Sequence, residues 1–226
     1  MDKRLRKLVD KIENEALRKK TLAILENPTV KIDGKVFSGL SLDSSPAGLS
    51  RHHSYPGGFV DHTVATAEIA LSLCDVVERV YAGKVNRDFV LSGIILHDVF
   101  KPLTYAENKD RNYTITPLGD YLDHLSLVVS EMVKRGFPLE IVHIVASHHG
   151  GDVGPLWPMT VEALICHLAD LVDSRLNGEI LRAARYLSRQ ATGIELPLLT
   201  SKEAFAIVHA KTSKGWDQMK ETAEKI

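Results

Sequence analysis

Apolar residues recur every three or four positions from about residue 59 to the end of the chain, and this periodicity limits the fold more than any other feature. In residues 59–82 the recurring side chains include Ile69, Leu73, Val76 and Val80, which share one face of a helix. Stretches with the same periodicity cover residues 87–100, 119–135, 138–149, 160–189, 201–210 and 214–225. Since helices with one apolar face bury it against each other, the sequence predicts an all-α fold.

The first 58 residues are organised differently. Residues 2–26 are predicted to be helical with a break near Asn14, and Asn27-Pro28 ends that unit. Asp33-Gly34, between short apolar runs, predicts one short β-hairpin near residues 29–37. Serine, proline and glycine dominate the stretch up to residue 58 and predict a long loop, of a length that is often functional in a compact domain.

Charge and composition narrow the functional class. The 226 residues carry 28 Lys and Arg against 29 Asp and Glu, and a net charge of -1 argues against a dedicated nucleic-acid binder. Basic residues concentrate in the first twenty positions, where interleaved acids and apolar residues favour a solvated helix face over a nucleic-acid patch. The charged N-terminus and the lack of an apolar run of roughly 18 residues predict a cytoplasmic protein that does not span a membrane.

Histidines gather in a few short segments. Seven of the ten fall in four places: His52, His53 and His62; His97; His124; and His148 and His149. Asp98 follows His97 at the end of an apolar helical stretch, where a buried carboxylate is costly unless it is paired or bound to metal. Neighbouring helical residues point about 100° apart, which suits two ligands converging on one ion. Lys101 projects on the same side of that turn, and we predict that its ammonium group holds a substrate phosphate.

Two further candidates lie outside this segment. Asp170 stands in an otherwise apolar helical stretch, three residues from His167 and from Asp173, which share its helix face. His62 follows a glycine-containing turn and begins a helix. Mixed sets of imidazole and carboxylate are ligands for Mn, Fe, Ni, Co, Zn or Mg. The sequence therefore predicts a site for divalent metal ions.

The order of these residues resembles that of the HD superfamily of metal-dependent phosphohydrolases, in which a His, a His-Asp pair and a later Asp lie on separate helices. His62, His97, Asp98 and Asp170 match this order, although Phe100 stands where the family usually has Gly. Within the superfamily, residues 45–175 most resemble the HD domain of YhaM-type 3′–5′ exoribonucleases. The blocks that carry this likeness are HHSYPGGFVDH at 52–62, Leu-His-Asp at 96–98, SHHG at 147–150 and EALICHLAD at 162–170.

The resemblance implies an HD-domain helical bundle with a two-metal centre bridged by Asp98. It implies His62, His97 and Asp170 on one ion and His124, His148 and His149 on the other. Two ions about 3.5–4 Å apart clamp the attacking and leaving oxygens of a phosphate displacement and bring the pKa of a bound water to about 7. Asp98 and Lys101 are the predicted catalytic residues, with Lys101 and the ions absorbing charge while hydroxide attacks phosphorus.

Residues near these blocks receive supporting roles. His52 and His53 are predicted to contact substrate. His167 and Glu162 are predicted to support the ligands or to pack between helices, and Asp173 to stabilise its own helix. Tyr55 and Trp157 are predicted to pack in loops beside the site, with stacking on a base as the alternative.

The segments follow from these assignments. Residues 1–27 form an N-terminal helical segment, 28–58 a loop region leading to the site, 59–190 the HD metal-binding core, and 191–226 C-terminal helices packed on that core. Burial of the first and last segments against a second subunit, giving a homo-oligomer, is an alternative that composition does not test.

We therefore predict a metal-dependent hydrolase of phosphate esters, acting on a phosphomonoester or phosphodiester of a nucleotide or short oligonucleotide. The similar exoribonucleases carry an N-terminal OB-like nucleic-acid domain, whereas residues 1–27 are predicted to be helical, so RNA is not the favoured substrate. Two alternatives stay open: an HD-type di-iron oxygenase with the same ligand pattern, and a non-catalytic regulatory module that binds metal or nucleotide. Lys101 and the exoribonuclease-like blocks favour phosphate chemistry.

Overall fold

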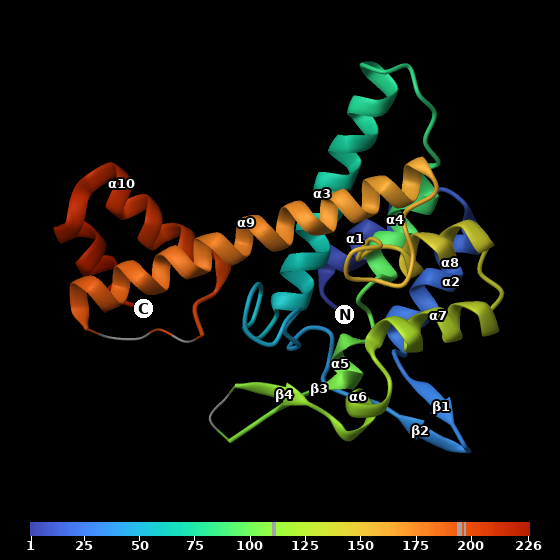
Figure 1. Cartoon of the computed structure of the whole chain (residues 1–226), viewed down its shortest axis with the longest axis horizontal. Helices are drawn as coiled ribbons and strands as arrows, with labels where there is room; N and C mark the ends of the chain where they lie inside the picture. Colours follow the sequence, from blue (N-terminus) through green and yellow to red (C-terminus); the bar gives the residue numbers. More distant parts are fainter. Residues whose placement is uncertain (110–111, 194–195, 197) are drawn as a thin grey trace.

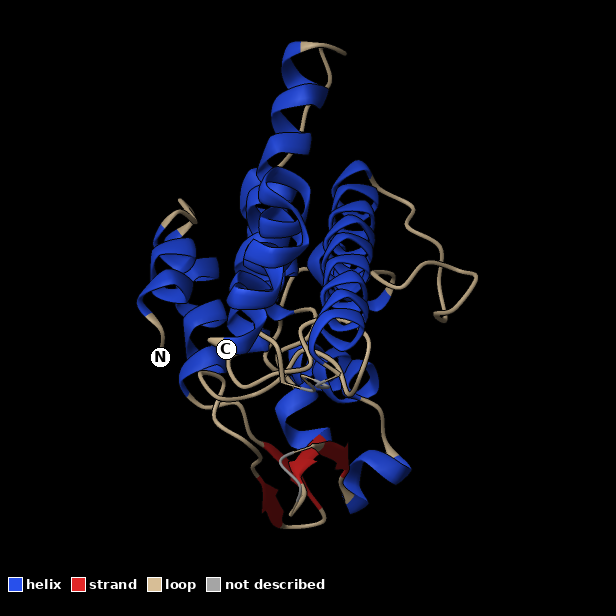
Figure 2. Ribbon diagram, turned by 90° about the vertical axis from the view of Figure 1, so that its left-hand side faces the viewer, coloured by secondary structure: helices blue, strands red, loops and turns tan. Residues whose placement is uncertain are grey.

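The computed structural model describes the chain except residues 110–111, 194–195 and 197, and it is helical with two small antiparallel hairpins (Figures 1 and 2). The elements before the metal-binding segments are α1 (Lys3–Asp10), α2 (Glu15–Glu26), β1 (Val30–Ile32), β2 (Lys35–Phe37) and α3 (Gly58–Arg79). The middle of the chain forms α4 (Arg87–Leu96), α5 (Lys101–Thr104), β3 (Tyr105–Glu107), β4 (Tyr113–Ile115), α6 (Pro117–Tyr121) and α7 (His124–Lys134). The last elements are α8 (Leu139–Ala146), α9 (Val161–Thr192) and α10 (Ser201–Glu224). The predicted all-α fold class is confirmed.

The main hydrophobic core lies between α3, α4, α8 and the first half of α9, with α1 and α2 packed against α3 and α4. The helix α4 is central to it, because every residue from Val90 to Leu96 is buried. Its apolar sequence therefore reflects contact with helices on several sides rather than an amphipathic surface position. This central placement carries the end of α4, where His97 and Asp98 stand, into the interior.

Element boundaries near the site differ from the sequence-based prediction. The helix predicted over residues 87–100 ends at Leu96, and Pro102 lies in the first turn of α5 instead of stopping α4. Proline fits there because the first helical residues donate no intrahelical hydrogen bond. Phe100, where the family usually has Gly, has a φ of -103°, a backbone conformation open to any side chain. The departure from Gly therefore introduces no backbone strain.

The helix predicted over residues 119–135 is two helices. Asp123 caps α7 by accepting a hydrogen bond from the backbone amide of Ser126 at 2.7 Å, so His124 is the first helical residue. The preceding polar loop is partly the hairpin β3–β4, which pairs Tyr105 with Ile115. The hairpin predicted near residues 29–37 is confirmed as β1–β2, which pairs Val30 with Phe37.

A second, smaller core lies at the far end of α9. There α10 packs along the second half of α9, and residues such as Leu181, Ile207 and Met219 are buried between them. Figure 1 shows this pair of helices projecting away from the main bundle. Gly215, with a φ of 85°, divides α10 into two segments that match the predicted helices near 201–210 and 214–225. Among the described helices, none is long and apolar enough to cross a membrane.

Gly93 is the contact point between α4 and α8, and a larger residue there is expected to destabilise the fold. A Cβ atom at this position would lie 2.4 Å from Cγ2 of the buried Ile144. We expect Gly93→Ala to lower the free energy of unfolding by roughly 1–3 kcal/mol, as overpacking does, measured by urea denaturation.

Gly178 in α9 supplies the matched control. A Cβ atom there meets nothing closer than the Arg51 carbonyl oxygen at 3.6 Å, an ordinary contact. Gly178→Ala should raise the stability by up to about 1 kcal/mol, because alanine favours the helix. Equal effects of the two substitutions would contradict the packing argument.

Candidate metal centre

Five separate stretches of chain meet at one buried cluster of histidine and aspartate. His62 comes from the second turn of α3, His97 and Asp98 from the end of α4, and His124 from the first turn of α7. The remaining members are His148 and His149, in the turn after α8, and Asp170 in α9. The structure thus brings together all seven residues predicted as metal ligands.

Asp98 lies at the middle of the cluster, and its two oxygens face different histidines. Oδ2 lies 3.4 Å from Nε2 of His62 and 3.4 Å from Nε2 of His97. Oδ1 lies 3.2 Å from Nε2 of His124 and 3.7 Å from Nε2 of His148. Two groups of ligand atoms result, each within 4.8 Å: His62, His97 and Asp98, and Asp98, His124, His148 and His149. Asp98 belongs to both groups, as a bridging carboxylate would.

Asp170 adds a carboxylate on the side of His62. Its Oδ1 lies 3.3 Å from Nε2 of His62 and 3.9 Å from Nε2 of His97. Asp170 Oδ1 also accepts a hydrogen bond from the Ser174 hydroxyl at 3.2 Å, one turn further along α9. The arrangement therefore matches the predicted set of His62, His97, Asp98 and Asp170.

Hydrogen bonds on the outer ring nitrogens orient three of the histidines. Nδ1 of His97 donates to the Ile94 carbonyl oxygen at 2.6 Å, and Nδ1 of His148 donates to the Val145 carbonyl oxygen at 2.7 Å. Nδ1 of His62 lies 2.7 Å from Oδ2 of Asp173. Because the outer nitrogen carries the proton in this arrangement, Nε2 of each ring directs a lone pair at the centre, the form that binds metal.

The centre has the unmatched acceptors that a cation would satisfy. Among the described residues, both Asp98 oxygens and Nε2 of His124 and His148 are buried and have no hydrogen-bond partner, although Lys101 forms an ion pair with Asp98. Nε2 of His62 and Nε2 of His97 are 3.1 Å apart, so either a proton or a cation must lie between two lone pairs. Buried acceptors without partners are costly. The residues present therefore fit a divalent metal with mixed nitrogen and oxygen ligands.

The electrostatics of the cluster also favour a cation. Burial alone would raise the pKa of Asp98, but the positive charge around it, from His97 and Lys101, holds it well below its usual range. Burial would lower the pKa of His62, yet Asp170, Asp173 and Asp98 raise it well above its ordinary value. The carboxylates therefore remain ionised and attract positive charge to Nε2 of His62, which a metal ion can supply in place of a proton.

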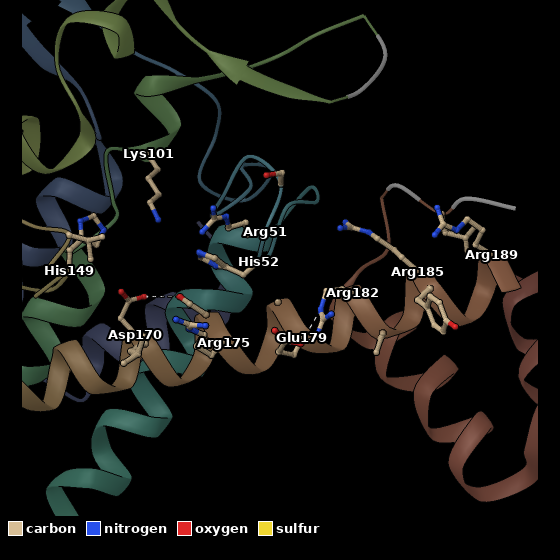
Figure 3. A pocket seen from close by; sticks show the side chains of 18 residues that line it. Arg51, His52, Lys101, His149, Asp170, Arg175, Glu179, Arg182, Arg185 and Arg189 are labelled. Atoms are coloured by element: carbon tan, nitrogen blue, oxygen red, sulfur yellow. Dashed lines mark hydrogen bonds and ion pairs between the residues drawn. The ribbon is translucent and has the colours of Figure 1, made fainter.

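Lys101 is buried beside the cluster. Its Nζ lies 2.5 Å from Oδ2 of Asp98, and the Asp98 charge raises the pKa of Lys101 although burial alone would lower it. Lys101 also lines a cavity of about 1140 Å³, together with His52, His149 and Asp170 at the inner end (Figure 3). The ammonium group therefore reaches both the cluster and the space where a substrate would lie.

His52 and His53 are adjacent in sequence, but they face different environments. His52 lines the cavity, and burial lowers its pKa to about 3, so it is a neutral imidazole at physiological pH. His53 is buried behind the cluster, where its ring nitrogens lie 3.1 Å from the Tyr55 hydroxyl and 2.8 Å from Oδ2 of Asp173. The structure thus places His52 at the predicted substrate side and turns His53 away from it.

Asp173 has a role that the sequence analysis did not find. It was predicted to stabilise its own helix, but its carboxylate is buried and Oδ2 accepts hydrogen bonds from both His53 and His62. These bonds lower the pKa of Asp173 to about 2 in spite of burial. The signal was its position three residues after Asp170, on the same face of α9.

The structure places some of the other predicted supporting residues beside the cluster and others away from it. Nδ1 of His167 donates to the His148 carbonyl oxygen at 2.7 Å and so holds the turn that carries His148. Glu162 is not brought to the cluster; it accepts a hydrogen bond from the backbone amide of Asn86 at 2.9 Å and joins α9 to the start of α4. Tyr55 is buried against α10, as packing predicts, whereas Trp157 is 59% exposed in the loop before α9.

Comparisons with known proteins agree with this geometry. The HD domain family matches residues 59–175. A dihydroneopterin 2′,3′-cyclic phosphate phosphodiesterase of Methanocaldococcus jannaschii is 39% identical over 212 residues, which are 94% of this chain and 84% of that protein. The YhaM 3′–5′ exoribonucleases of Listeria monocytogenes and Bacillus pumilus are each 34% identical over 142 residues, or 58% of this chain. The match spans only 43% of their length. No solved structure gave a significant match.

The helical fold and the buried histidine-aspartate cluster define a metal-dependent phosphohydrolase. The chain belongs to the HD domain family, and the predicted membership of that family is confirmed. It is an enzyme of the phosphohydrolase and phosphodiesterase class, as its relatives are.

Asp173 is expected to act as a positioning residue through His62. Replacing it with Asn keeps the shape but removes the charge that polarises the imidazole. We expect Asp173→Asn to weaken metal binding about 10–100-fold, as loss of such supporting carboxylates does, measured by titration calorimetry with Mn²⁺. Asp120→Asn, an exposed change on α6, is the control. Unchanged metal affinity in Asp173→Asn would show that the carboxylate only packs.

Proposed function

We propose that this chain is a phosphodiesterase that opens the 2′,3′-cyclic phosphate of a small substrate, using two divalent ions. The observation that carries the proposal is the 39% identity to the dihydroneopterin 2′,3′-cyclic phosphate phosphodiesterase over 94% of this chain. That match covers nearly the whole chain and therefore extends well beyond the HD region at residues 59–175. Because that relative acts on a cyclic phosphodiester, we favour a cyclic diester over a monoester as the substrate.

The ligand assignment follows from the geometry around Asp98. In the proposal, His62, His97, Asp98 and Asp170 hold one ion, and Asp98, His124, His148 and His149 hold the other. When bound, such ions lower the pKa of water and neutralise charge on phosphoryl oxygens. Asp98 would supply one oxygen to each group of ligands.

Lys101 and His52 face the substrate side of the centre. The Lys101 ammonium group stabilises the negative charge that builds on the phosphoryl oxygens, in a buried position where such charge is poorly screened. His52, being neutral, accepts or donates one hydrogen bond without adding a charge. In the reaction, a water oxygen forms a bond to phosphorus, one ester P–O bond breaks, and the leaving oxygen takes up a proton. The product is an open phosphomonoester.

A substrate panel tests the proposal. The chain loaded with Mn²⁺ is assayed against dihydroneopterin 2′,3′-cyclic phosphate, nucleoside 2′,3′-cyclic phosphates, and linear monoesters and diesters. We expect the cyclic diesters to show a kcat/KM at least tenfold above the linear esters. Faster turnover of monoesters would overturn the proposed substrate class.

The same samples distinguish the di-iron oxygenase. Chain reconstituted with Fe²⁺ is placed in an oxygen electrode with the same compounds. Oxygen consumption coupled to their loss would favour that alternative, whereas the proposal expects phosphate-ester opening without oxygen uptake.

A further inference from the structure

The cavity beside the metal centre extends into a groove lined mainly by arginines. Among the described residues that line it, six carry positive charge: Arg51, Lys101, Arg175, Arg182, Arg185 and Arg189. The acidic residues among the described lining residues are Asp170 and Glu179, and Asp170 is a proposed metal ligand. The chain as a whole has a net charge of -1. The groove is therefore locally positive although the chain as a whole is nearly neutral.

The arginines of α9 form a row that leads away from the metal centre. Arg175, Arg182 and Arg189 follow each other at seven-residue intervals, so they fall within about 40° of each other around the helix. At a rise of 1.5 Å per residue, Arg182 lies roughly 18 Å and Arg189 roughly 28 Å along the helix from Asp170. In Figure 3, Arg175 and Arg182 lie close along α9, Arg189 rises from the helix, and Arg51 lies on the loop across from it.

The length of this row exceeds what a small cyclic phosphate needs. A substrate whose only phosphate lies at the metal centre would not extend as far as Arg182 and Arg189. Successive phosphates of an extended single strand, by contrast, meet such a row one after another. Glu179, which forms an ion pair with Arg182, would share that guanidinium with a phosphate. The row is thus suited to a chain of phosphates rather than to one.

The groove also has an aromatic surface. Tyr186 lines it between Arg182 and Arg189 and is 55% exposed. Leu171 and Val153 line the part nearer the metal centre. Proteins that bind single strands combine a positive groove for the backbone with aromatic side chains on which bases stack. An inorganic polyphosphate would use the arginines but not these apolar surfaces.

From these observations we infer that the groove along α9 binds a single-stranded oligonucleotide whose terminal phosphodiester reaches the metal centre. Arg175, Arg182 and Arg189 contact successive backbone phosphates, and Tyr186 stacks on a base. The inference rests on the proposed function in one respect, because the end of the strand is the part that is hydrolysed. It adds a substrate of several linked nucleotides to the small cyclic phosphates of that proposal.

The test measures binding separately from turnover. A 5′-fluorescein-labelled hexaadenylate RNA ending in a 2′,3′-cyclic phosphate is titrated by fluorescence anisotropy with the full chain carrying Asp98→Asn. The titration is repeated with the unchanged chain in EDTA. We expect Arg182→Gln/Arg189→Gln to weaken binding about tenfold to thirtyfold. The slope of log K against log salt should become shallower by about 1.4, for two lost phosphate contacts.

Matched variants separate the groove from net charge. Arg6→Gln/Arg79→Gln removes the same charge at two exposed ion pairs outside the groove, with Asp10 and Asp75, and should bind the RNA like the unchanged chain. Tyr186→Ala should weaken RNA binding about fivefold or more, as loss of a stacking platform does. Equal effects of the two double variants would overturn the inference. The inference would also be overturned if a polyphosphate of the same charge bound more tightly than the RNA and Tyr186→Ala did not change RNA binding.

Turnover then distinguishes this inference from the proposed function. In Mn²⁺-loaded chain without the Asp98 change, Arg182→Gln/Arg189→Gln should lower kcat/KM for the hexaadenylate at least tenfold more than for adenosine 2′,3′-cyclic phosphate. If the mononucleotide is opened but the hexanucleotide binds no better, the inference fails and the proposed function stands. If the RNA binds in the groove but no cyclic phosphate is opened, the proposed function fails and the groove stands.

Discussion

Replacing Asp98 with Asn should strongly reduce both metal retention and phosphodiesterase activity. Among the described residues, Asp98 belongs to both ligand groups, with Oδ2 toward His62 and His97 and Oδ1 toward His124 and His148. An amide offers only one oxygen and no charge. Since each ion in such a centre contributes several kcal/mol to charge stabilisation, we expect kcat/KM to fall by at least about 1000-fold. Metal content, measured by plasma mass spectrometry, should fall from about two ions per chain to below one.

The substitution must be separated from unfolding. Lys101 loses its charged partner in Asp98→Asn, and an unpaired buried ammonium is destabilising. Circular dichroism and the thermal midpoint therefore accompany the assay, with Asp120→Asn as an exposed control of the same chemistry. A folded Asp98→Asn chain that keeps its metal and more than a tenth of its activity would refute the bridging role.

Removal of the metal should lower the thermal stability of the chain by roughly 10 °C. Without a cation, both oxygens of Asp98 and Nε2 of His124 and His148 are buried acceptors without partners among the described residues. A ligand that binds only the folded state at about 1000 times its Kd contributes about 4 kcal/mol. For a chain of this size that corresponds to about 8–16 °C in Tm. The measurement is differential scanning calorimetry of chelated chain before and after addition of Mn²⁺.

The control for metal removal is the Asp98→Asn chain. Because it lacks the central carboxylate, Mn²⁺ should raise its Tm by less than a third of the shift seen in the unchanged chain. The same small shift in both proteins would mean that Mn²⁺ binds elsewhere, on surface carboxylates for example.

Local patterns were sufficient to predict most of the helices, because apolar spacing and capping residues act over a few positions. The break at Asn14 is an example: its side chain accepts the amide of Leu17 at 3.0 Å and begins α2. Prediction was wrong where a short-range signal was weak. Asp123 lies in the middle of the helix predicted over residues 119–135, where its role as the cap of α7 is hard to predict, and the hairpin β3–β4 has strands of three residues each.

Side-chain direction was harder to predict than position. His52 and His53 look equivalent in sequence, yet the positive φ of His53, 44°, turns that ring toward Asp173 and Tyr55. Asp173 was predicted to stabilise its own helix, but the packing of α3 against α9 places His62 on its carboxylate. Such contacts join residues more than one hundred positions apart, which no local pattern reports.

The metal cluster and the arginine groove mark the limits of sequence reasoning on this chain. Histidines and aspartates at the ends of apolar helices were enough to identify the candidate ligands, since buried ionisable residues need a partner or a metal. The net charge of -1 gave no sign of the arginines of the groove, because acidic residues elsewhere in the chain balance them. The long helix α9 aligns four of these arginines, and the loop carrying Arg51 adds a fifth to the same cavity. Electrostatic potential depends on where charges lie in space and not on how many the chain contains.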